Sequence, residues 1–241
     1  VGMMLARVSM RLGQQRLAWG NSDAFPINDA INPRDLHDPL IAETELLRLP
    51  TVAARLDLNF DDVSFTLAVM PFFVPDRLDT YGTNYAFVGP RAPAGIRGAF
   101  GTLSNAVDPS LREPNQVLLR QTELPKDDGS ATAVGARMNA SLGGIDLTPS
   151  YHYGYTTQPD LRVDPAFAQF IATTDWTQPS AEAVGALLGA RGTGLLTATY
   201  RRRHHAGLSL ATTVGSFVVR GEAAYDSALV FYQPSLLSIV R

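Results

Sequence analysis

Residues 134–155, VGARMNASLGGIDLTPSYHYGY, carry the strongest structural signal in the sequence. In Val134–Leu142 apolar side chains alternate with Gly, Arg, Asn and Ser, and the alternation resumes in Ile145–Tyr155. Because a period of two puts successive side chains on opposite faces of a β-strand, both runs are predicted strands. Gly143-Gly144 between them predicts a two-residue hairpin turn, since glycine tolerates positive φ. Each run has about the 9–11 residues that a tilted strand needs to cross a bilayer.

The same alternation recurs on both sides of this hairpin. Further short turns are expected at Asp61-Asp62 and Gly215-Ser216, and a basic turn at Arg202–His205. With one more strand near Tyr85–Val88, we expect about eight or nine strands in all. The remaining predicted strands are Ala6–Leu12, Arg55–Phe60, Val63–Val69, Leu196–Arg201, Ala206–Val214 and Phe217–Tyr225.

Long connections rich in Pro, Asn and Asp separate the predicted hairpins. They span roughly Gly20–Pro50, Pro71–Gly129 and Thr157–Gly192. Short turns at one end of the strands and long loops at the other are typical of outer-membrane β-barrels.

Short helices are expected inside the long connections. Asp108-Pro109 and Asp164-Pro165 each place an N-cap residue before a proline at the first helical position. Ser180–Leu188 (SAEAVGALL) is a third candidate.

Composition narrows the class of protein. Of the 241 residues 45% are hydrophobic and 18% are charged, and the net charge of −3 gives no reason to expect a nucleic-acid partner. Lys126 is the single lysine, and cysteine is absent, which excludes disulfides and thiolate metal sites. The sequence contains no run of about 18 or more apolar residues, so it predicts no membrane-spanning helix. The opening residues Val1–Met4 show no signal peptide while strand-like alternation begins almost at once, so we expect sequence to be missing before them.

Alternation alone does not say which face meets water, because a soluble barrel or sandwich is turned inside out relative to a membrane barrel. The polar face mixes Gly, Ser, Thr and Ala with Arg and acids, unlike the Lys/Glu cover of a soluble surface. Arg220 and Glu222 lie two residues apart on one face, as in a hydrated lumen. Tyr151, Tyr153 and Tyr155 end an apolar face as an aromatic girdle would. We therefore predict an all-β fold, a transmembrane antiparallel barrel, over a single domain of residues 1–241.

The alternation also predicts which side chains line the lumen. Six bases against four acids leave a modest positive excess, and rings of Arg are found in anion-selective pores. The alternative interpretation pairs these residues as cross-strand salt bridges that stiffen the barrel. Tyr225 joins the three tyrosines above as a girdle candidate facing lipid. The lumen candidates are Arg7, Arg11, Arg55, Arg137, Arg201, Arg220, Asp57, Asp146, Glu222, Asp226 and His152.

No catalytic motif stands out, so we do not expect an enzyme, a cofactor or a metal site. There is no Gly-x-Ser-x-Gly elbow, no His-Glu-x-x-His and no phosphate loop. The adjacent pair His204-His205 would point to opposite faces of a strand and is a poor metal site. Some barrels are hydrolases, but a solvated loop or a lumen hydrogen bond explains each candidate better. Those candidates are Asp35, His37, Asp38, Asp146 and His152.

Several short motifs occur along most of the chain: RLGQQRLAWG (11–20), INPRD (31–35), Pro50, Leu56–Phe73, Gly135–Arg137, Tyr151–Tyr155 and VRGEAAY (219–225). Together they resemble a large family of proteobacterial outer-membrane, porin-like barrels with a strand that ends in Trp-Gly. Members are often encoded near export or lipid-transport machinery, so the resemblance implies an export-associated role. The family usually has longer chains and a terminal aromatic residue, whereas this chain ends Ser238–Arg241, so we expect a segment of a larger barrel.

Three functions remain open from the sequence. The leading hypothesis is a passive or export-associated channel of the bacterial outer membrane, in contact with membrane lipids. The second is a structural or docking barrel whose long loops bind other cell-envelope proteins. The third is a soluble β-barrel that binds a small ligand. The substrate and the oligomeric state do not follow from the sequence.

Overall fold

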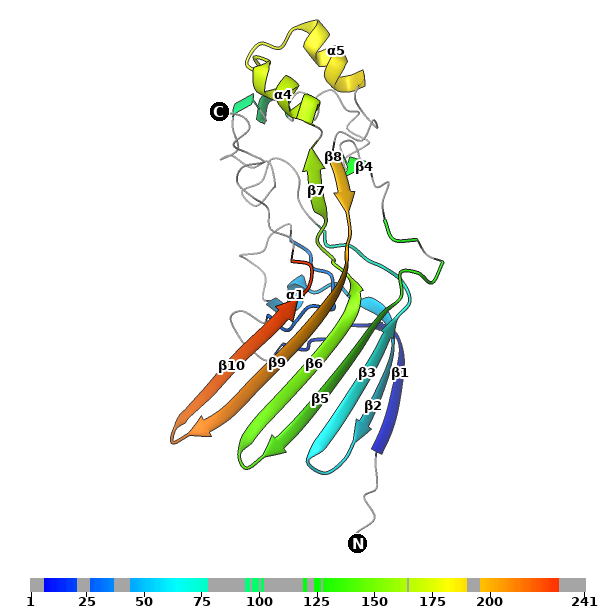
Figure 1. Cartoon of the computed structure of the whole chain (residues 1–241), viewed down its shortest axis with the longest axis vertical. Helices are drawn as coiled ribbons and strands as arrows, with labels where there is room; N and C mark the ends of the chain where they lie inside the picture. Colours follow the sequence, from blue (N-terminus) through cyan, green and yellow to red (C-terminus); the bar gives the residue numbers. More distant parts are fainter. Residues whose placement is uncertain are drawn as a thin grey trace.

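Seven strands form one antiparallel sheet, drawn in the lower half of Figure 1. The structure is a computed structural model, and it describes residues 7–20, 27–36, 44–77, 94–95, 97–99, 101, 119–120, 124–126, 128–163, 165–189 and 196–229. In spatial order the strands are β1 (Arg7–Gln15), β2 (Thr51–Asn59), β3 (Val63–Met70), β5 (Ala133–Leu142), β6 (Ile145–Tyr155), β9 (Arg202–Val214) and β10 (Phe217–Asp226).

A smaller sheet and short helices lie beyond one end of this sheet (Figure 1). In the smaller sheet β8 (Leu196–Thr199) pairs with β4 (Leu119–Arg120) and β7 (Asp160–Val163). The helices with described bounds are α1 (Thr44–Leu47), α4 (Pro165–Thr173) and α5 (Ala181–Gly189), and residues 94–95, 97–99 and 101 are helical as well. None of them is long and apolar enough to cross a membrane.

The predicted hairpin of residues 134–155 is confirmed, and so are the turns at Asp61-Asp62 and Gly215-Ser216. Gly143 and Gly144 take φ values of 58° and 84°, which a side chain would disfavour. All three short turns lie at the same end of the sheet, opposite the smaller sheet and the helices (Figure 1). The expected asymmetry between short turns and long connections is therefore present.

Two of the three predicted helices are confirmed. Pro165 opens α4, and α5 follows Ser180, whose hydroxyl accepts a hydrogen bond from Ala183 N at 3.1 Å as an N-cap. The third helix, at Asp108-Pro109, and the strand near Tyr85–Val88 lie outside the described residues.

The predicted basic turn at Arg202–His205 is wrong. These residues are the first four of β9 and continue its ladder with β6, where Arg202 pairs with Tyr155. The interruption between strands falls at Tyr200-Arg201 instead, and the preceding strand, β8, belongs to the smaller sheet. The cluster of charges resembled a solvated turn, but the tyrosines of β6 give Arg202 and His204 aromatic partners that keep them in the strand.

The sheet is not closed into a barrel by the described residues. β1 and β10 each pair with one neighbour only, so both have an open edge. What the structure establishes is a mostly β chain with one seven-stranded antiparallel sheet.

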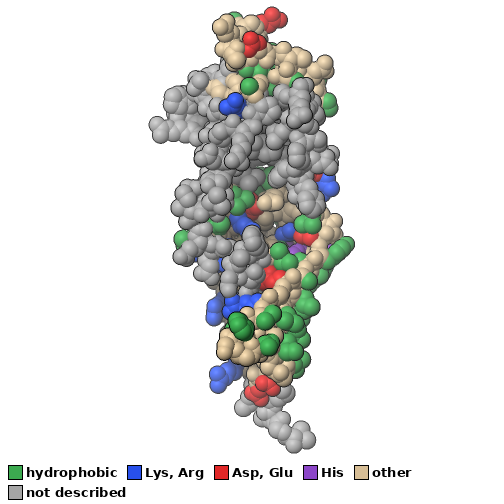
Figure 2. Space-filling model, turned by 90° about the vertical axis from the view of Figure 1, so that its left-hand side faces the viewer, with side chains coloured by type: hydrophobic (Ala, Val, Ile, Leu, Met, Phe, Trp, Pro, Cys, Tyr) green, Lys and Arg blue, Asp and Glu red, His purple; other side chains and the backbone are tan. Residues whose placement is uncertain are grey.

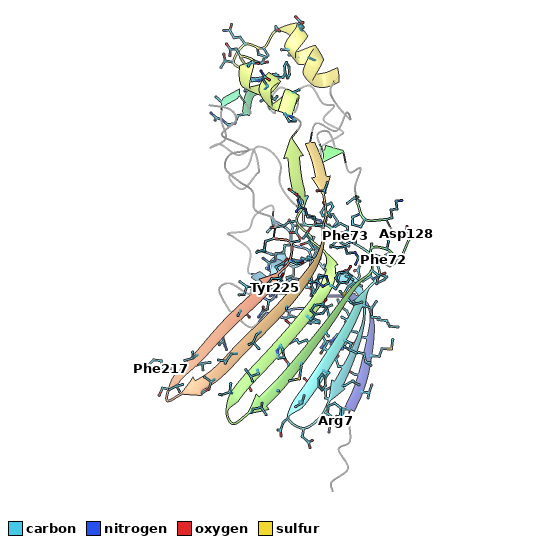
Figure 3. The ribbon with its side chains drawn as sticks, in the orientation of Figure 1. Arg7, Phe72, Phe73, Asp128, Phe217 and Tyr225 are labelled. Atoms are coloured by element: carbon cyan, nitrogen blue, oxygen red, sulfur yellow. The ribbon has the colours of Figure 1, made fainter. Side chains whose placement is uncertain are left out.

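The two faces of the sheet have an unusual distribution of side chains. On one face, which we call the apolar face, large hydrophobic side chains are exposed, such as Met10 (65%) and Leu67 (45%). On the other, the polar face, Asp57 is 6% exposed and Ser209 only 1%. Figure 2 shows the hydrophobic side chains gathered along the surface of the sheet, and in Figure 3 Phe217 and Tyr225 mark the two ends of β10 on this face. A soluble protein normally has the opposite arrangement.

The polar face is covered by the chain that follows β1. The described parts of this stretch are residues 16–20 and 27–36, which we call the inner segment. Its Leu17, Trp19 and Ile31 form a small buried cluster with Ala53, Ala68 and Met70 of β2 and β3. This hydrophobic cluster thus lies between the inner segment and one end of the polar face.

Candidate functional site

The strand register brings most of the predicted lumen residues together on the polar face. One row across the sheet runs Arg11, Arg55, Ala68, Gly135, His152, His205 and Asp226. The next runs Ser9, Asp57, Thr66, Arg137, Ser150, Gly207 and Ala224. Rows nearer the short turns contain the predicted candidates Arg7, Asp146, Arg220 and Glu222.

Arg201 lies elsewhere. It stands between β8 and β9, outside the seven-stranded sheet, and forms an ion pair with Asp160 of β7. Of the loop residues considered for hydrolase chemistry, Asp35 faces Arg77, with 3.5 Å between Oδ2 and Nη1, and His37 and Asp38 lie outside the described residues.

Polar groups on this face are connected within and between strands. Arg55 Nη2 lies 2.8 Å from Asp57 Oδ1, which also accepts a hydrogen bond from the Thr66 hydroxyl at 2.7 Å. Arg137 donates through Nε to Asn139 Oδ1 at 3.0 Å and through Nη1 to the Ala18 carbonyl at 3.1 Å. The Arg55–Asp57 pair lies within one strand, whereas Asp226 of β10 forms a cross-strand ion pair with Arg203 of β9.

Two glycines make room for the inner segment. A Cβ atom on Gly135 would lie 2.6 Å from Cη2 of Trp19, and one on Gly207 would lie 2.3 Å from Oδ1 of Asn28. Real Cβ atoms essentially never approach so closely. The inner segment therefore reaches the polar face where that face carries no side chain.

Hydrogen bonds then fasten the inner segment to β9 and β10. Asn28 Nδ2 donates to Ser209 Oγ at 2.8 Å, and Asn28 N donates to Glu222 Oε2 at 3.2 Å. Arg203 Nη2 donates to the Ala30 carbonyl at 2.7 Å. Since β9 and β10 lie about 180 residues further along the chain, these contacts fix a long-range fold.

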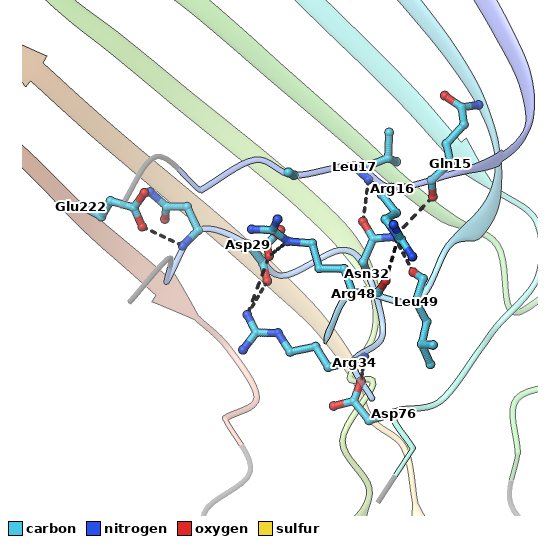
Figure 4. A network of polar contacts seen from close by, with 12 residues as sticks. Gln15, Arg16, Leu17, Asp29, Asn32, Arg34, Arg48, Leu49, Asp76 and Glu222 are labelled. Atoms are coloured by element: carbon cyan, nitrogen blue, oxygen red, sulfur yellow. Dashed lines mark hydrogen bonds and ion pairs between the residues drawn. The ribbon is translucent and has the colours of Figure 1, made fainter. Parts of the chain in front are cut away.

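A buried polar network holds the inner segment in shape (Figure 4). Asn32 Oδ1 accepts from Leu17 N at 2.6 Å, and Asn32 Nδ2 donates to the Leu49 carbonyl at 2.8 Å. The Asp29 carboxylate pairs with Arg48, and both side chains are almost fully buried, at 1% and 7% exposure. A second cation, Arg34, lies 3.9 Å from the same oxygen.

A cavity of about 590 Å³ opens between the inner segment and the end of the polar face nearest the long connections; we call it the polar cavity. Its ionisable lining residues are Asp29, Arg34, Asp76, Arg203, His205 and Asp226. Asp226 Oδ2 lies 2.8 Å from Arg203 Nη1 and 3.3 Å from His205 Nδ1.

Asp76 lies just beyond the end of β3, on the wall of the polar cavity. Burial raises the pKa of this carboxyl, although hydrogen bonds from Arg34 N and Thr157 and the charge of Arg34 act in the opposite direction. The Arg34 N–H donates to Asp76 Oδ1 at 2.8 Å.

On the apolar face, three of the predicted girdle tyrosines lie around Arg202 and His204, at the end of the sheet nearest the long connections. The Arg202 guanidinium lies 5.0 Å from the ring centre of Tyr153 and 4.4 Å from that of Tyr155. The Tyr151 hydroxyl is 2.7 Å from His204 Nδ1. Tyr225 occupies the same row as Tyr151, two strands away, and is 66% exposed. This aromatic and basic group lies at one end of the sheet, as an interfacial belt would.

Sequence reasoning missed the residues that build the inner segment and the polar cavity: Asn28, Asp29, Asn32, Arg48, Asp76 and Arg203. The signal that could have found them is the pair of inward glycines, Gly135 and Gly207, where a lumen wall would otherwise carry side chains. No group of three or more metal-ligating side chains occurs in the part of the chain that the structure describes.

Comparison with known proteins gives one match. Residues 5–236 match the family described as "Protein of unknown function (DUF1302)". No curated protein and no solved structure matches the chain.

Proposed function

This chain belongs to the DUF1302 family, and we propose that its sheet is part of the wall of a β-barrel channel in a bacterial outer membrane. The observation that carries the proposal is the reversed distribution of side chains, with large hydrophobic residues exposed on one face and polar residues covered on the other. An exposed apolar face is stable against acyl chains, and a polar face suits a hydrated lumen. Closing the barrel requires further pairing on the open edges of β1 and β10.

Two other features support a membrane position. The tyrosines of β6, with Arg202 and His204, lie at the end of the sheet that carries the long connections. Tyr side chains are enriched where a barrel meets the headgroups, and the long loops of outer-membrane barrels lie on the extracellular side. The apolar face would therefore contact lipid, and this belt would lie at the outer interface.

The inner segment makes this a constricted channel. It lies across the polar face and is fastened there by hydrogen bonds at Ala18, Asn28 and Ala30 and by its part of the buried hydrophobic cluster. Passage of a solute would require this segment to move or would follow the space beside it. The same cover favours the second candidate, a closed barrel that serves as a docking subunit for other envelope proteins.

Conductance in planar bilayers, measured with a reversible lock on the inner segment, tests the proposal and separates the two candidates. Asn28 and Ser209 are in hydrogen-bond contact, and the chain has no native cysteine, so the double variant Asn28→Cys/Ser209→Cys offers a specific disulfide. We expect the oxidised protein to conduct little and dithiothreitol to restore current. A folded barrel that conducts in neither state would support the docking function, and recovery of the wild type from cells without detergent would contradict both.

A further inference from the structure

The polar cavity has the properties of a binding site, and the family gives it no assignment. Its volume of about 590 Å³ lies within the range of small-molecule pockets, about 300–1,000 Å³. Residues from the inner segment, from the stretch after β6 and from β9 and β10 line it together. It therefore exists only when the inner segment is folded onto the sheet.

The charges around the cavity are already neutralised by one another. Arg203 pairs with Asp226 at 2.8 Å, and Asp29 pairs with Arg48 and lies 3.9 Å from Arg34. The remaining carboxyl, Asp76, accepts a backbone hydrogen bond from Arg34. Arg34, Arg48 and Arg203 thus balance Asp29, Asp76 and Asp226, and no net charge is left to attract an ion.

Three lining residues carry a buried polar atom that has no hydrogen-bond partner among the described residues. They are Asp29 Oδ1, His205 Nε2 and Arg203 Nε. A buried polar group without a partner costs about 1–3 kcal/mol, so such atoms normally bind water or a ligand. All three atoms belong to residues that line the polar cavity.

Two of the three atoms are acceptors, so their main missing partner is a hydrogen-bond donor. A carboxylate oxygen such as Asp29 Oδ1 is an acceptor. Asp226 lies 3.3 Å from His205 Nδ1, which places the ring proton on Nδ1 and leaves Nε2 as an acceptor too. Only Arg203 Nε donates. Nearby on the polar face, Asn28 Oδ1 is another buried acceptor without a partner.

We propose that the polar cavity binds an uncharged, polyhydroxylated solute of the size of a small sugar. Each hydroxyl can donate to Asp29 Oδ1 or His205 Nε2 and accept from Arg203 Nε, which satisfies all three atoms at once. A carboxylate ligand lacks the donors that these atoms require. Phosphate keeps a P–OH donor near neutral pH, but the balanced ion pairs give its negative charge no attraction. Organic cations can donate, but the balanced ion pairs give them no attractive charge.

This inference deepens the proposed function, because it names the class of solute that the channel would carry. Binding is nevertheless testable without a membrane, on the folded protein in detergent micelles. Saturation-transfer NMR with sucrose as the probe, and with inorganic phosphate and lysine as comparison ligands, measures it directly. We expect saturable binding of sucrose and none of phosphate or lysine.

Two adjacent positions on β10 give a matched pair of variants. Ala224 lines the polar cavity, whereas Ala223 lies on the apolar face. Ala224→Phe should fill the cavity and weaken sucrose binding by about tenfold or more, while Ala223→Phe should leave it unchanged. In the wild type, sucrose should also shift the nitrogen resonance of His205 Nε2. The variant His205→Gln, which lacks this resonance, identifies it. This second readout does not depend on the folding of a cavity-filling variant.

Binding of phosphate or lysine as tightly as sucrose would overturn the proposal, as would equal binding to the two phenylalanine variants or an unshifted His205 resonance. These outcomes differ from a failure of the channel function. If the protein binds sucrose in micelles but never conducts, the proposed binding site stands and the proposed channel function is refuted.

Discussion

Replacing Gly207 with alanine should displace the inner segment while leaving the sheet intact. The added Cβ would lie 2.3 Å from Asn28 Oδ1 and 2.8 Å from Ser150 Oγ, both nearer than atoms can approach. The backbone of β9 is held by ladders on both sides. The side chains of Asn28 and Ser150 are therefore the groups that must move.

The magnitude follows from the hydrogen bonds that Asn28 would lose. The bond to Ser209 is neutral and contributes about 0.5–1.5 kcal/mol, and the bond to the Glu222 carboxylate contributes about 1.5–3 kcal/mol. The closed arrangement should thus lose about 2–4.5 kcal/mol. Since 1.4 kcal/mol is a factor of ten, the displaced population should rise by roughly 30-fold to 1,600-fold.

Single-channel recording in planar bilayers measures this as a rise in open probability. Gly221→Ala is the matched control, because a Cβ on Gly221 has no atom within 4 Å. Asn28→Ala, which removes the same contacts without crowding β9, should act in the same direction. If Gly207→Ala folds and its open probability equals that of the wild type and of Gly221→Ala, the inner segment does not close the channel.

Two further predictions concern the faces of the sheet and pH. Met10→Arg should impair assembly into membranes by about 2–4 kcal/mol, while Ser9→Arg, one residue away on the polar face opposite Asp57, should assemble normally; equal assembly yields would mean that the faces are misassigned. Burial raises the pKa of the Asp76 carboxyl above 3.8, so the protonated carboxyl stabilises the fold at low pH and this stabilisation is lost as the carboxyl ionises. Asp76→Asn should therefore unfold at a higher urea concentration than the wild type near pH 7. Near about pH 3 the two proteins should unfold at the same urea concentration. A constant difference between the two urea midpoints at all pH values would show that ionisation of Asp76 plays no part.

Local patterns were enough to predict the hairpins. The alternation in residues 134–155, the glycine turn and the segregation of apolar and polar faces depend on neighbours in sequence, and the structure has all three. Arg202–His205 was misassigned because charge density is a weak signal for a turn when partner side chains on another strand are unknown. Their partners on β6 are about 50 residues away.

The inner segment could not be predicted in this way. Asn28 and Asp29 look like ordinary loop residues, and their burial follows only from contacts with β9, β10 and Arg48. Gly135 and Gly207 were visible as inward positions without side chains, but nothing in the sequence said that Trp19 and Asn28 fill the space. The polar cavity could not be predicted for the same reason, since five of its sixteen lining residues belong to the inner segment.

The contact between the apolar face and lipid is tested most directly by quenching with brominated acyl chains. Adjacent exposed residues at both open edges of the sheet give matched sites: Met10 and Ser9 on β1, and Val219 and Val218 on β10. Since the chain has no cysteine, each can be replaced singly by cysteine and labelled with an environment-sensitive fluorophore. Brominated lipids should quench the labels at 10 and 219, and aqueous iodide those at 9 and 218. Equal quenching within each pair, or iodide quenching of all four, would contradict a sheet whose apolar face meets the membrane.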